Sequence, residues 1–321
     1  MNPVIGRDLR VVALGGGHGL AGVLEALRSL TENITAIVTV ADNGGSSGRL
    51  RKEFPIIPPG DLRMALAALC SDDEWGRSWA QILQYRFTGG GPLDGHAVGN
   101  LLLAALWDRD RDPVLGLDRV GSLLKVIGRV LPMSDEPLDI EASFDTPAGE
   151  RLVRGQVQVA TTPGKLLSLQ LLPHNPTPRP ESLKAIEEAH WITMGPGSWF
   201  SSVLPHVLAP AQREAIIKSH AKKILILNLD SSNSPRADEY SGYSPTEHIE
   251  ILREYGQGLH FDFIVADSQA ASDDPMLDEY CKNLKSELIY RDLRQSGEVA
   301  HHDREKLISL FSHIARKTLV G

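Results

Sequence analysis

Short apolar runs alternate with helical patterns along most of this 321-residue chain. Runs rich in β-branched residues predict buried strands, because parallel strands covered on both faces carry few polar positions. The predicted strands are residues 11–14 (VVAL), 34–40 (ITAIVTV), 191–194 (WITM), 223–229 (KILILNL), 261–266 (FDFIVA) and 287–291 (ELIYR). The predicted helices include residues 98–107, 180–190, 249–255 and 304–319. This alternation predicts an α/β fold that is Rossmann-like, with a mostly parallel sheet and helices on both faces.

The alternation is interrupted between residues 125 and 173. In this segment, short β-rich runs at 127–131, 156–160 and 166–172 are separated by proline, glycine and charged turns, which is typical of antiparallel strands. We therefore expect residues 1–124 and 174–321 to form a Rossmann-like nucleotide-binding core. Residues 125–173 are expected to form a small antiparallel β-rich insertion, the inserted lobe.

The sequence also argues against several classes of protein. Its net charge of −8 disfavours non-specific binding to nucleic acid or to anionic membranes. No apolar stretch is long enough to span a bilayer, and the first residues lack the apolar segment of a signal peptide. The two cysteines, Cys70 and Cys281, form neither a CxxC motif nor a disulfide framework. We expect a cytoplasmic protein that binds no nucleic acid and inserts into no membrane.

A glycine-rich turn follows the first predicted strand. Gly15, Gly16, Gly17 and Gly19 stand between that strand and a helical pattern, and Gly17, Gly19 and Gly22 fit the spacing of a dinucleotide fingerprint. Glycines let the backbone approach an anion, and a helix N-terminus offers free N–H groups. The pattern predicts a phosphate site, and the competing interpretation is a tight turn without a ligand.

A second turn, with the sequence ADNGGSSGR at residues 41–49, follows the second predicted strand. Asp42 at the end of that strand is suited to hold a ribose hydroxyl or a divalent cation. Ser46, Ser47 and backbone N–H groups could bind phosphate oxygens, and Arg49 could neutralise their charge. A flexible surface turn is the competing interpretation, which the position of both turns after consecutive strands disfavours.

Three more segments place polar groups after strands or at helix starts. PPGDLR supplies Asp61 and Arg63, GHAVGN supplies His96 and Asn100, and GPGS at residues 195–198 repeats the strand–glycine–helix pattern. Taken singly, Asp61 is more typical of a helix cap and His96 of a structural histidine. Their number and their shared position after strands favour one composite site.

Other catalytic and metal motifs are absent or weak in the sequence. There is no Walker A motif and no G-x-S-x-G elbow. His301 and His302 are adjacent, so they do not face one ion, and Asp303 is placed to cap the helix that follows. No metal site is predicted here.

The glycine turns belong to a longer series of motifs. GGGHGL, TVADNGGSSGRLR, PPGDLR, GHAVGNLLLAAL, RVLPMS and GPGSWFSSVLP occur in this order. The chain thereby resembles the gluconeogenesis factor family (YvcK/CofD-like), which is related to 2-phospho-L-lactate transferase, from about Arg10 to about Lys317. The resemblance implies a Rossmann-like core with a smaller inserted lobe.

The two branches of this family imply different activities. The gluconeogenesis factor branch implies binding of a UDP-sugar such as UDP-N-acetylglucosamine, linked to cell shape and wall synthesis. The transferase branch implies metal-dependent transfer of a phospholactyl-type group from a guanylated donor to a deazaflavin alcohol. Carried over by motif, the ligand-binding residues would be Gly15, Gly16, Gly17, His18, Gly19, Asp42, Asn43, Gly44, Gly45, Ser46, Ser47, Arg49, Asp61, Arg63, His96, Asn100, Gly195, Pro196, Gly197 and Ser198. None is assigned to catalysis.

Three positions depart from the pattern of the family. His18 stands where relatives usually have threonine, which removes a hydroxyl contact to phosphate. His301 stands where many relatives have arginine, and a neutral imidazole cannot make a bidentate contact to a diphosphate. Asn43 replaces a common acid and so removes one potential metal ligand, which disfavours metal-dependent transfer.

Three hypotheses follow for the function. The favoured one is a non-catalytic regulatory protein that binds a nucleotide sugar and needs no cofactor. The second is a transferase of the 2-phospho-L-lactate transferase type, for which alone Mg²⁺ is expected. The third, an NAD-dependent oxidoreductase, depends only on the Gly17, Gly19 and Gly22 spacing. The apolar pair Trp199 and Phe200 could serve a homodimer interface or pack in the core.

Overall fold

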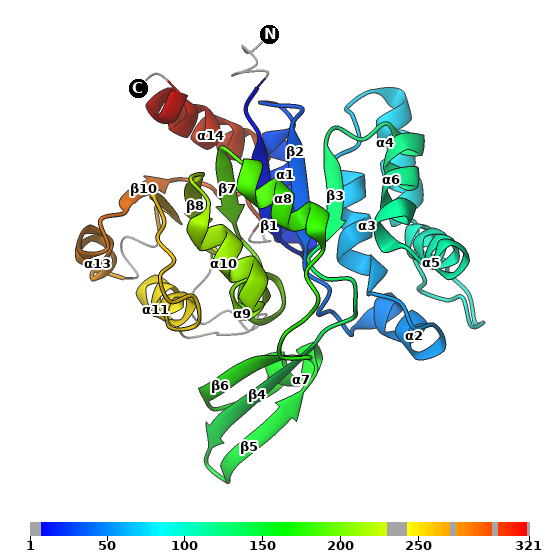
Figure 1. Ribbon diagram of the computed structural model, residues 1–321, viewed down its shortest axis with the longest axis horizontal. Helices are drawn as coiled ribbons and strands as arrows, with labels where there is room; N and C mark the ends of the chain where they lie inside the picture. Colours follow the sequence, from blue (N-terminus) through cyan, green and yellow to red (C-terminus); the bar gives the residue numbers. More distant parts are fainter. Residues whose placement is uncertain (1–7, 230–242, 270–273, 297–300, 320–321) are drawn as a thin grey trace.

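A seven-stranded parallel sheet forms the centre of the computed structural model, which describes residues 8–229, 243–269, 274–296 and 301–319 (Figure 1). Across the sheet the strands are β10 (Glu287–Arg291), β9 (Phe263–Asp267), β8 (Lys222–Ile226), β7 (Trp191–Met194), β1 (Val11–Gly15), β2 (Ile34–Val38) and β3 (Arg129–Pro132). Every neighbouring pair is parallel. The expected α/β architecture is confirmed.

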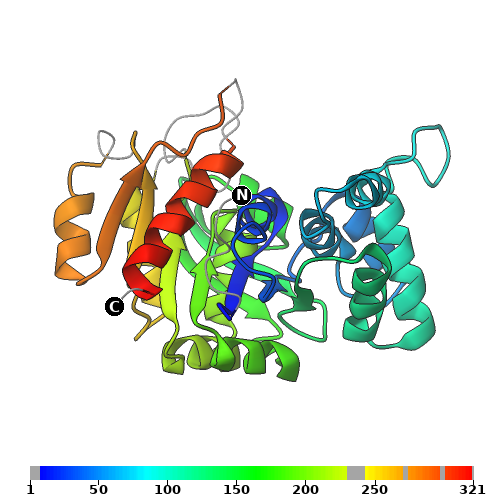
Figure 2. The ribbon, with the colours of Figure 1, turned by 90° about the horizontal axis from the view of Figure 1, so that it is seen from above.

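The central strands are apolar because helices cover both faces of the sheet. All five residues of β1 are buried, and so are all five of β9. Figure 2 shows α1 and α14 on one face and α8 and α10 on the other. This burial explains why unbroken apolar runs, rather than alternating patterns, marked the strands in the sequence.

The helices connect the strands and extend the molecule beyond β3. They are α1 (Gly17–Leu27), α2 (Gly45–Glu53), α3 (Pro59–Ala68), α4 (Glu74–Gln84), α5 (Val98–Asp110), α6 (Pro113–Leu124), α7 (Gln156–Thr161), α8 (Pro180–Glu188), the π-helical turn η1 (Trp199–Val203), α9 (Pro205–Leu208), α10 (Pro210–Lys218), α11 (Pro245–Tyr255), α13 (Leu277–Asn283) and α14 (Arg304–Leu319). None of the helices in the described ranges is long and apolar enough to cross a membrane.

A small antiparallel sheet lies beyond the carboxyl ends of the parallel strands (Figure 1). Its central strand is β4 (Asp139–Thr146), flanked by β5 (Gly149–Arg154) and β6 (Lys165–Leu172). Helix α7 follows β5 and packs against this sheet. The predicted limits of the inserted lobe, residues 125–173, remain a prediction.

Two of the runs expected to form antiparallel strands in the insertion adopt other structures. The run at 127–131 contributes β3, which pairs in parallel with β2 through Thr35 and Arg129, because Val130 and Leu131 are buried at the edge of the main sheet. The run at 156–160 lies in α7, where Val159 is buried and its N–H bonds the Gly155 carbonyl at 2.9 Å. In the first segment the strand forms but joins the parallel sheet, and in the second a helix replaces the expected strand, so tertiary burial decides both outcomes.

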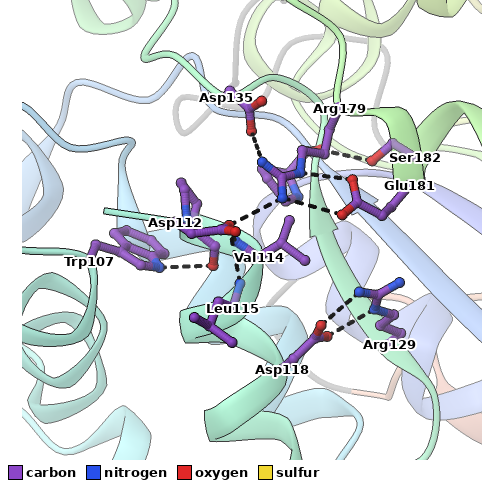
Figure 3. A network of polar contacts seen from close by, with 12 residues as sticks. Trp107, Asp112, Val114, Leu115, Asp118, Arg129, Asp135, Arg179, Glu181 and Ser182 are labelled. Carbon is purple, nitrogen blue, oxygen red and sulfur yellow. Dashed lines mark hydrogen bonds and ion pairs between the residues drawn. The ribbon is translucent and has the colours of Figure 1, made fainter. Parts of the chain in front are cut away.

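The two chain crossings between the parallel sheet and the lobe, residues 132–136 and 177–182, form a neck held by polar contacts (Figure 3). Arg179 forms ion pairs with Asp112, Asp135 and Glu181 at 2.8–3.1 Å. The Ser182 hydroxyl donates to the Pro132 carbonyl at 2.9 Å. One guanidinium group therefore ties both crossings to the start of α6.

Candidate functional site

Three glycine-rich segments meet at the carboxyl edge of the sheet, because they follow the adjacent strands β7, β1 and β2. Residues 15–17 lead from β1 into α1, residues 42–44 lead towards α2, and residues 195–198 lead into η1. The lobe lies beyond the same edge (Figure 1). This is the position at which open parallel sheets bind their ligands.

Around the turn after β1, close packing or backbone conformation favours glycine at several positions. A Cβ atom on Gly19 would lie 2.3 Å from the Pro196 carbonyl oxygen, so the start of α1 touches the turn after β7 through backbone. Gly17 has φ +60, a left-handed conformation that favours glycine. The two turns, predicted separately from sequence, form one surface.

Two residues that the sequence did not identify, Asn228 and His206, bond the backbone of the glycine turns. Asn228, just after β8, accepts from the Gly197 N–H at 2.9 Å and donates to the Gly197 carbonyl at 3.0 Å. Burial lowers the pKa of His206 to about 4, although hydrogen bonds to the Gly15 backbone and to Gln212 oppose the shift. Asn228 had a signal in the sequence, since it is a polar residue at the end of an apolar strand.

The second predicted turn is largely the first turn of helix α2, whose N-cap is Gly44. Asp42 accepts a hydrogen bond from the Gly44 N–H at 2.8 Å, and its pKa is raised by burial, against hydrogen bonds from Gly44 and Ser47. Ser47 in turn accepts from the Gly60 N–H at 3.0 Å. This chain of contacts joins the starts of α2 and α3.

Ser46 connects α2 to helix α5. Its hydroxyl lies 2.9 Å from His96 Nδ1 and accepts from Asn100 Nδ2 at 3.0 Å. Burial, followed by the charge of Arg49, lowers the pKa of His96. The imidazole is therefore neutral at neutral pH, and its Nδ1 atom shares a hydrogen bond with the Ser46 hydroxyl. The Asn100 Oδ1 atom is buried without a hydrogen-bond partner.

Asp61 does not cap helix α3, contrary to the sequence expectation. The helix starts at Pro59, so Asp61 lies inside its first turn and faces the glycine turn instead. Its carboxylate lies 2.4 Å from where a Cβ of Gly16 would be, and it accepts a hydrogen bond from the Gly17 N–H. Burial and then the charge of Asp42 raise the pKa of Asp61 to about 7. Two carboxylates thus share one region of the site.

Arg63 lies two residues further into α3 and is only 3% exposed. Its aliphatic part packs against Gly99, its Nη1 donates to Gln84, and its Nε atom is buried without a partner. Burial and then the charge of Arg86 lower its pKa to about 10. Arg86 carries no local motif, and the sequence did not identify it.

The two histidines that depart from the family pattern lie side by side. The ring centroids of His18 and His301 are 6.2 Å apart. Burial and then the charge of His301 lower the pKa of His18. No group of three metal-ligating side chains gathers here or elsewhere in the described part of the chain. Asp303 accepts from the Lys306 N–H at 3.0 Å and caps α14, as predicted.

The lobe contacts the site through the start of α7. Gln156 Nε2 donates to the Ser201 hydroxyl at 3.0 Å, and the Ser201 hydroxyl donates to Ser198 at 2.7 Å. Asn43 also faces the lobe, because a Cβ on Gly155 would lie 2.3 Å from its Nδ2 atom. Trp199 and Phe200 are each 2% exposed, so this apolar pair packs in the core.

A cavity of about 390 Å³ lies elsewhere, between α6 and β3. Leu66, Asp118, Lys125 and Arg129 are among the residues that line it, and none of the predicted site residues does. The cavity is at the start of β3, whereas the glycine turns are at the carboxyl ends of the strands. It is not part of the predicted ligand site.

Comparison with known proteins agrees with the motifs. Residues 11–315 match the model of the family described as "2-phospho-L-lactate transferase CofD". A Mycobacterium tuberculosis protein named "Putative gluconeogenesis factor" is 44% identical over 96% of this chain and 90% of its own length. A "Gluconeogenesis factor" of Halalkalibacterium halodurans is 39% identical over 79% of this chain and 76% of its own length.

A solved structure shows the same architecture. It is a protein of the UPF0052 family from Bacillus halodurans, with a TM-score of 0.83 and 33% sequence identity. The match covers 96% of this chain and 99% of the solved one. Because the family model and the relatives each span most of the sequence, the chain belongs to the CofD/UPF0052 family, whose members include the gluconeogenesis factors.

Proposed function

We propose that this protein binds a nucleotide sugar of the UDP-N-acetylglucosamine type at the carboxyl edge of its sheet. In this proposal it is a cytoplasmic regulatory protein without catalytic activity. Membership of the gluconeogenesis factor family further suggests a role in cell shape and wall synthesis during growth on gluconeogenic carbon.

The observation that carries the proposal is that the N-termini of α1 and α2 lie beside glycine turns at this edge. The N-cap residues of the two helices are Gly16 and Gly44, which have no side chain to bond the first turn. In α1, Asp61 accepts the hydrogen bond of the Gly17 N–H. Helix N-termini beside glycine turns provide the donors and the partial positive charge that a diphosphate needs.

The polar side chains of the site favour binding over chemistry. Ser46, Ser47 and Asp42 are each engaged in hydrogen bonds that join neighbouring helices. Ser46 and His96 are only 5% and 7% exposed, and the Ser46 hydroxyl also accepts from Asn100. The pair is therefore buried in the link between α2 and α5. In this proposal, these side chains hold the helix starts in position around the ligand.

A metal-dependent transferase is the second candidate, because Asp42 and Asp61 repel each other beside the glycine turn. Mg²⁺ is often held by one or two carboxylates together with substrate phosphates. Asp42 and Asp61 fit that role, and the cation would stabilise charge on the transferred group. Asn43 does not add to this pair, since its side chain lies against the lobe.

Calorimetric titration with UDP-N-acetylglucosamine, UDP and a guanine nucleotide, each with and without Mg²⁺, separates the two candidates. Tight binding of the UDP-sugar without Mg²⁺ supports the regulatory protein. Binding of the guanine nucleotide alone, and only with Mg²⁺, would contradict it and support the transferase.

A matched pair of glycine variants in α1 tests whether the predicted surface binds the ligand. Gly19→Ala places a methyl group against the Pro196 carbonyl, whereas Gly22→Ala meets nothing within 4 Å. We expect Gly19→Ala to abolish binding and Gly22→Ala to retain it. Equal affinities of the two variants would place the ligand elsewhere.

A further inference from the structure

Three arginines at the carboxyl edge, here called the basic cluster, form no ion pair with a carboxylate. They are Arg49 in α2, Arg63 in α3 and Arg86 between α4 and α5. Within the described residues none of them takes part in an ion pair. Asp61 is the acidic group that acts on Arg63, but its own pKa is raised to about 7, so it neutralises the cluster only in part. In a chain of net charge −8, this excess of positive charge requires an explanation.

Two of these arginines meet at one turn. Arg49 Nη2 donates to the Asp94 carbonyl at 2.7 Å, and Arg86 Nη1 donates to the Gly95 carbonyl at 2.9 Å. These carbonyls belong to successive residues, and His96 follows them directly. The two guanidinium groups are exposed and are held on the side of the site where Ser46 contacts His96.

Arg63 completes the cluster from the protein side. It is almost fully buried, its Nε atom has no partner, and the charge of Arg86 adds to burial in lowering its pKa. The charges of Arg49 and Arg86 also oppose protonation of His96. The cationic groups of the cluster therefore repel one another in the ligand-free protein, and an anion between them would remove that cost.

We propose that the basic cluster is a phosphate subsite, next to the uncapped start of α2, and that Arg86 is its principal anion-binding residue. Three guanidinium groups, together with backbone N–H groups, match a dianionic phosphate better than a single carboxylate. The phosphate is either part of the nucleotide sugar or carried by a second, phosphorylated molecule. The inference rests on the proposed function only if the phosphate belongs to the nucleotide sugar.

The test compares Arg86→Gln, Arg86→Lys and a control, Arg316→Gln. Arg316 is an exposed residue in the last turn of α14, a helix that Figure 1 shows on the far side of the sheet from α2. The probes are inorganic phosphate, inorganic pyrophosphate, UDP and UDP-N-acetylglucosamine, titrated by calorimetry at two salt concentrations. We expect Arg86→Gln to bind the phosphate-containing probes about 10-fold more weakly or worse, and Arg86→Lys to fall between it and the unmodified protein.

The probes distinguish the two sources and the two proposals. Loss of UDP-sugar affinity in Arg86→Gln supports a phosphate of the nucleotide sugar. Loss confined to inorganic phosphate and pyrophosphate supports the second molecule. If the unmodified protein binds pyrophosphate but no UDP-sugar, and Arg86→Gln loses it, the subsite stands and the proposed function fails. If Arg86→Gln binds every probe like Arg316→Gln, the subsite is refuted and the proposed function is untouched.

Thermal unfolding separates a binding role from a structural one. Because Arg86 repels Arg63, we expect Arg86→Gln without ligand to unfold at the same or a higher temperature than the unmodified protein. Inorganic phosphate should stabilise the unmodified protein more than the variant. A lower unfolding temperature together with unchanged stabilisation by phosphate would instead assign Arg86 to supporting the Gly95 carbonyl, and would overturn the proposal.

Discussion

Arg179 in the neck and the arginines of the basic cluster have opposite electrostatic surroundings. Arg179 faces three carboxylates, and although burial opposes its charge, hydrogen bonds to Asp135 and Glu181 raise its pKa (Figure 3). Arg63 is more deeply buried, faces Arg86 and has a lowered pKa. An arginine with its own carboxylates holds the fold together, whereas one without them is available to an anion from outside.

The same contrast occurs within one helix. Arg51 in α2 forms an ion pair with Asp139 at 3.2 Å and donates to the Asp42 carbonyl at 2.9 Å. Arg49, two residues earlier, contacts a backbone carbonyl but no carboxylate. Because Arg49 and Arg51 lie on the same helix, their different surroundings do not result from lying in different parts of the molecule. The difference is that an acidic side chain forms an ion pair with Arg51 and, among the described residues, none does so with Arg49.

The largest effect is expected for Arg179→Gln. The variant leaves Asp112, Asp135 and Glu181 close together without their shared cation. Because the arginine is largely buried while the carboxylates are partly screened by water, we expect the free energy of unfolding in urea to fall by about 2 to 3 kcal/mol. Lys184→Gln in α8, which removes an exposed pair with Glu188, should cost less than about 0.5 kcal/mol. A loss below about 1 kcal/mol for Arg179→Gln would show that the neck does not depend on this network.

Asp61 is a buried carboxylate with a like charge nearby, as Arg63 is a buried cation with a like charge nearby, so Asp61→Asn applies the same comparison to an acid. The native carboxyl keeps its proton up to about pH 7, while an ordinary aspartate releases it near pH 3.8. Between these values the native state binds more protons than the unfolded state, so stability falls as the pH rises and stays reduced above pH 7. Asparagine removes this loss, and we expect a gain on the order of 2 kcal/mol at pH 8 and little change at pH 4.

Urea unfolding at several pH values checks the Asp61 prediction. The difference in stability between the variant and the unmodified protein should grow from pH 4 to pH 8. A difference that is independent of pH would mean that Asp61 is ionised throughout, as it would be with a cation beside it. The same series with added Mg²⁺ therefore also bears on the transferase candidate.

Arg63→Met should separate stability from binding. Methionine keeps the packing against Gly99 and removes a buried charge whose Nε atom has no partner. We expect the free energy of unfolding to change by less than about 1 kcal/mol, in contrast to Arg179→Gln, while phosphate affinity falls about 10-fold. If Arg63→Met loses as much stability as Arg179→Gln and keeps its phosphate affinity, then Arg63 stabilises the fold as Arg179 does and does not bind phosphate.

The strands of the main sheet could be predicted because their burial leaves a local trace. The runs at 191–194 and 287–291 coincide with β7 and β10. β3 was misplaced because a four-residue strand at a sheet edge has no pattern that reveals its partner. Helix α2 was not predicted, since two glycines and many polar residues give it no apolar face.

The candidate site also has parts that could be predicted from the sequence and parts that could not. Glycine turns after adjacent strands could be predicted to meet, because the carboxyl ends of parallel strands share an edge. Arg86 could not, since it reaches the site through an antiparallel bridge between Arg86 and Ala97 that no motif marks. The environment of Asp61 was also hidden, because the neighbouring charge of Asp42 comes from another helix start.

The smallest expected effect is for a pair just outside the neck, and it tests whether pairing or burial makes an arginine contact stabilising. Arg129 makes a two-bond contact with Asp118 at 2.6 and 2.9 Å, yet the side chains are 43% and 39% exposed, against 15% for Arg179. Water screens the exposed pair, so Arg129→Gln should cost about 0.5 kcal/mol despite good geometry. A double-mutant cycle with Asp118→Asn isolates the coupling between the two side chains. If the coupling energy approaches the loss of stability in Arg179→Gln, pairing with a carboxylate is sufficient for an arginine to stabilise this fold. If the coupling energy is small, an arginine stabilises the fold only when its ion pair is also buried.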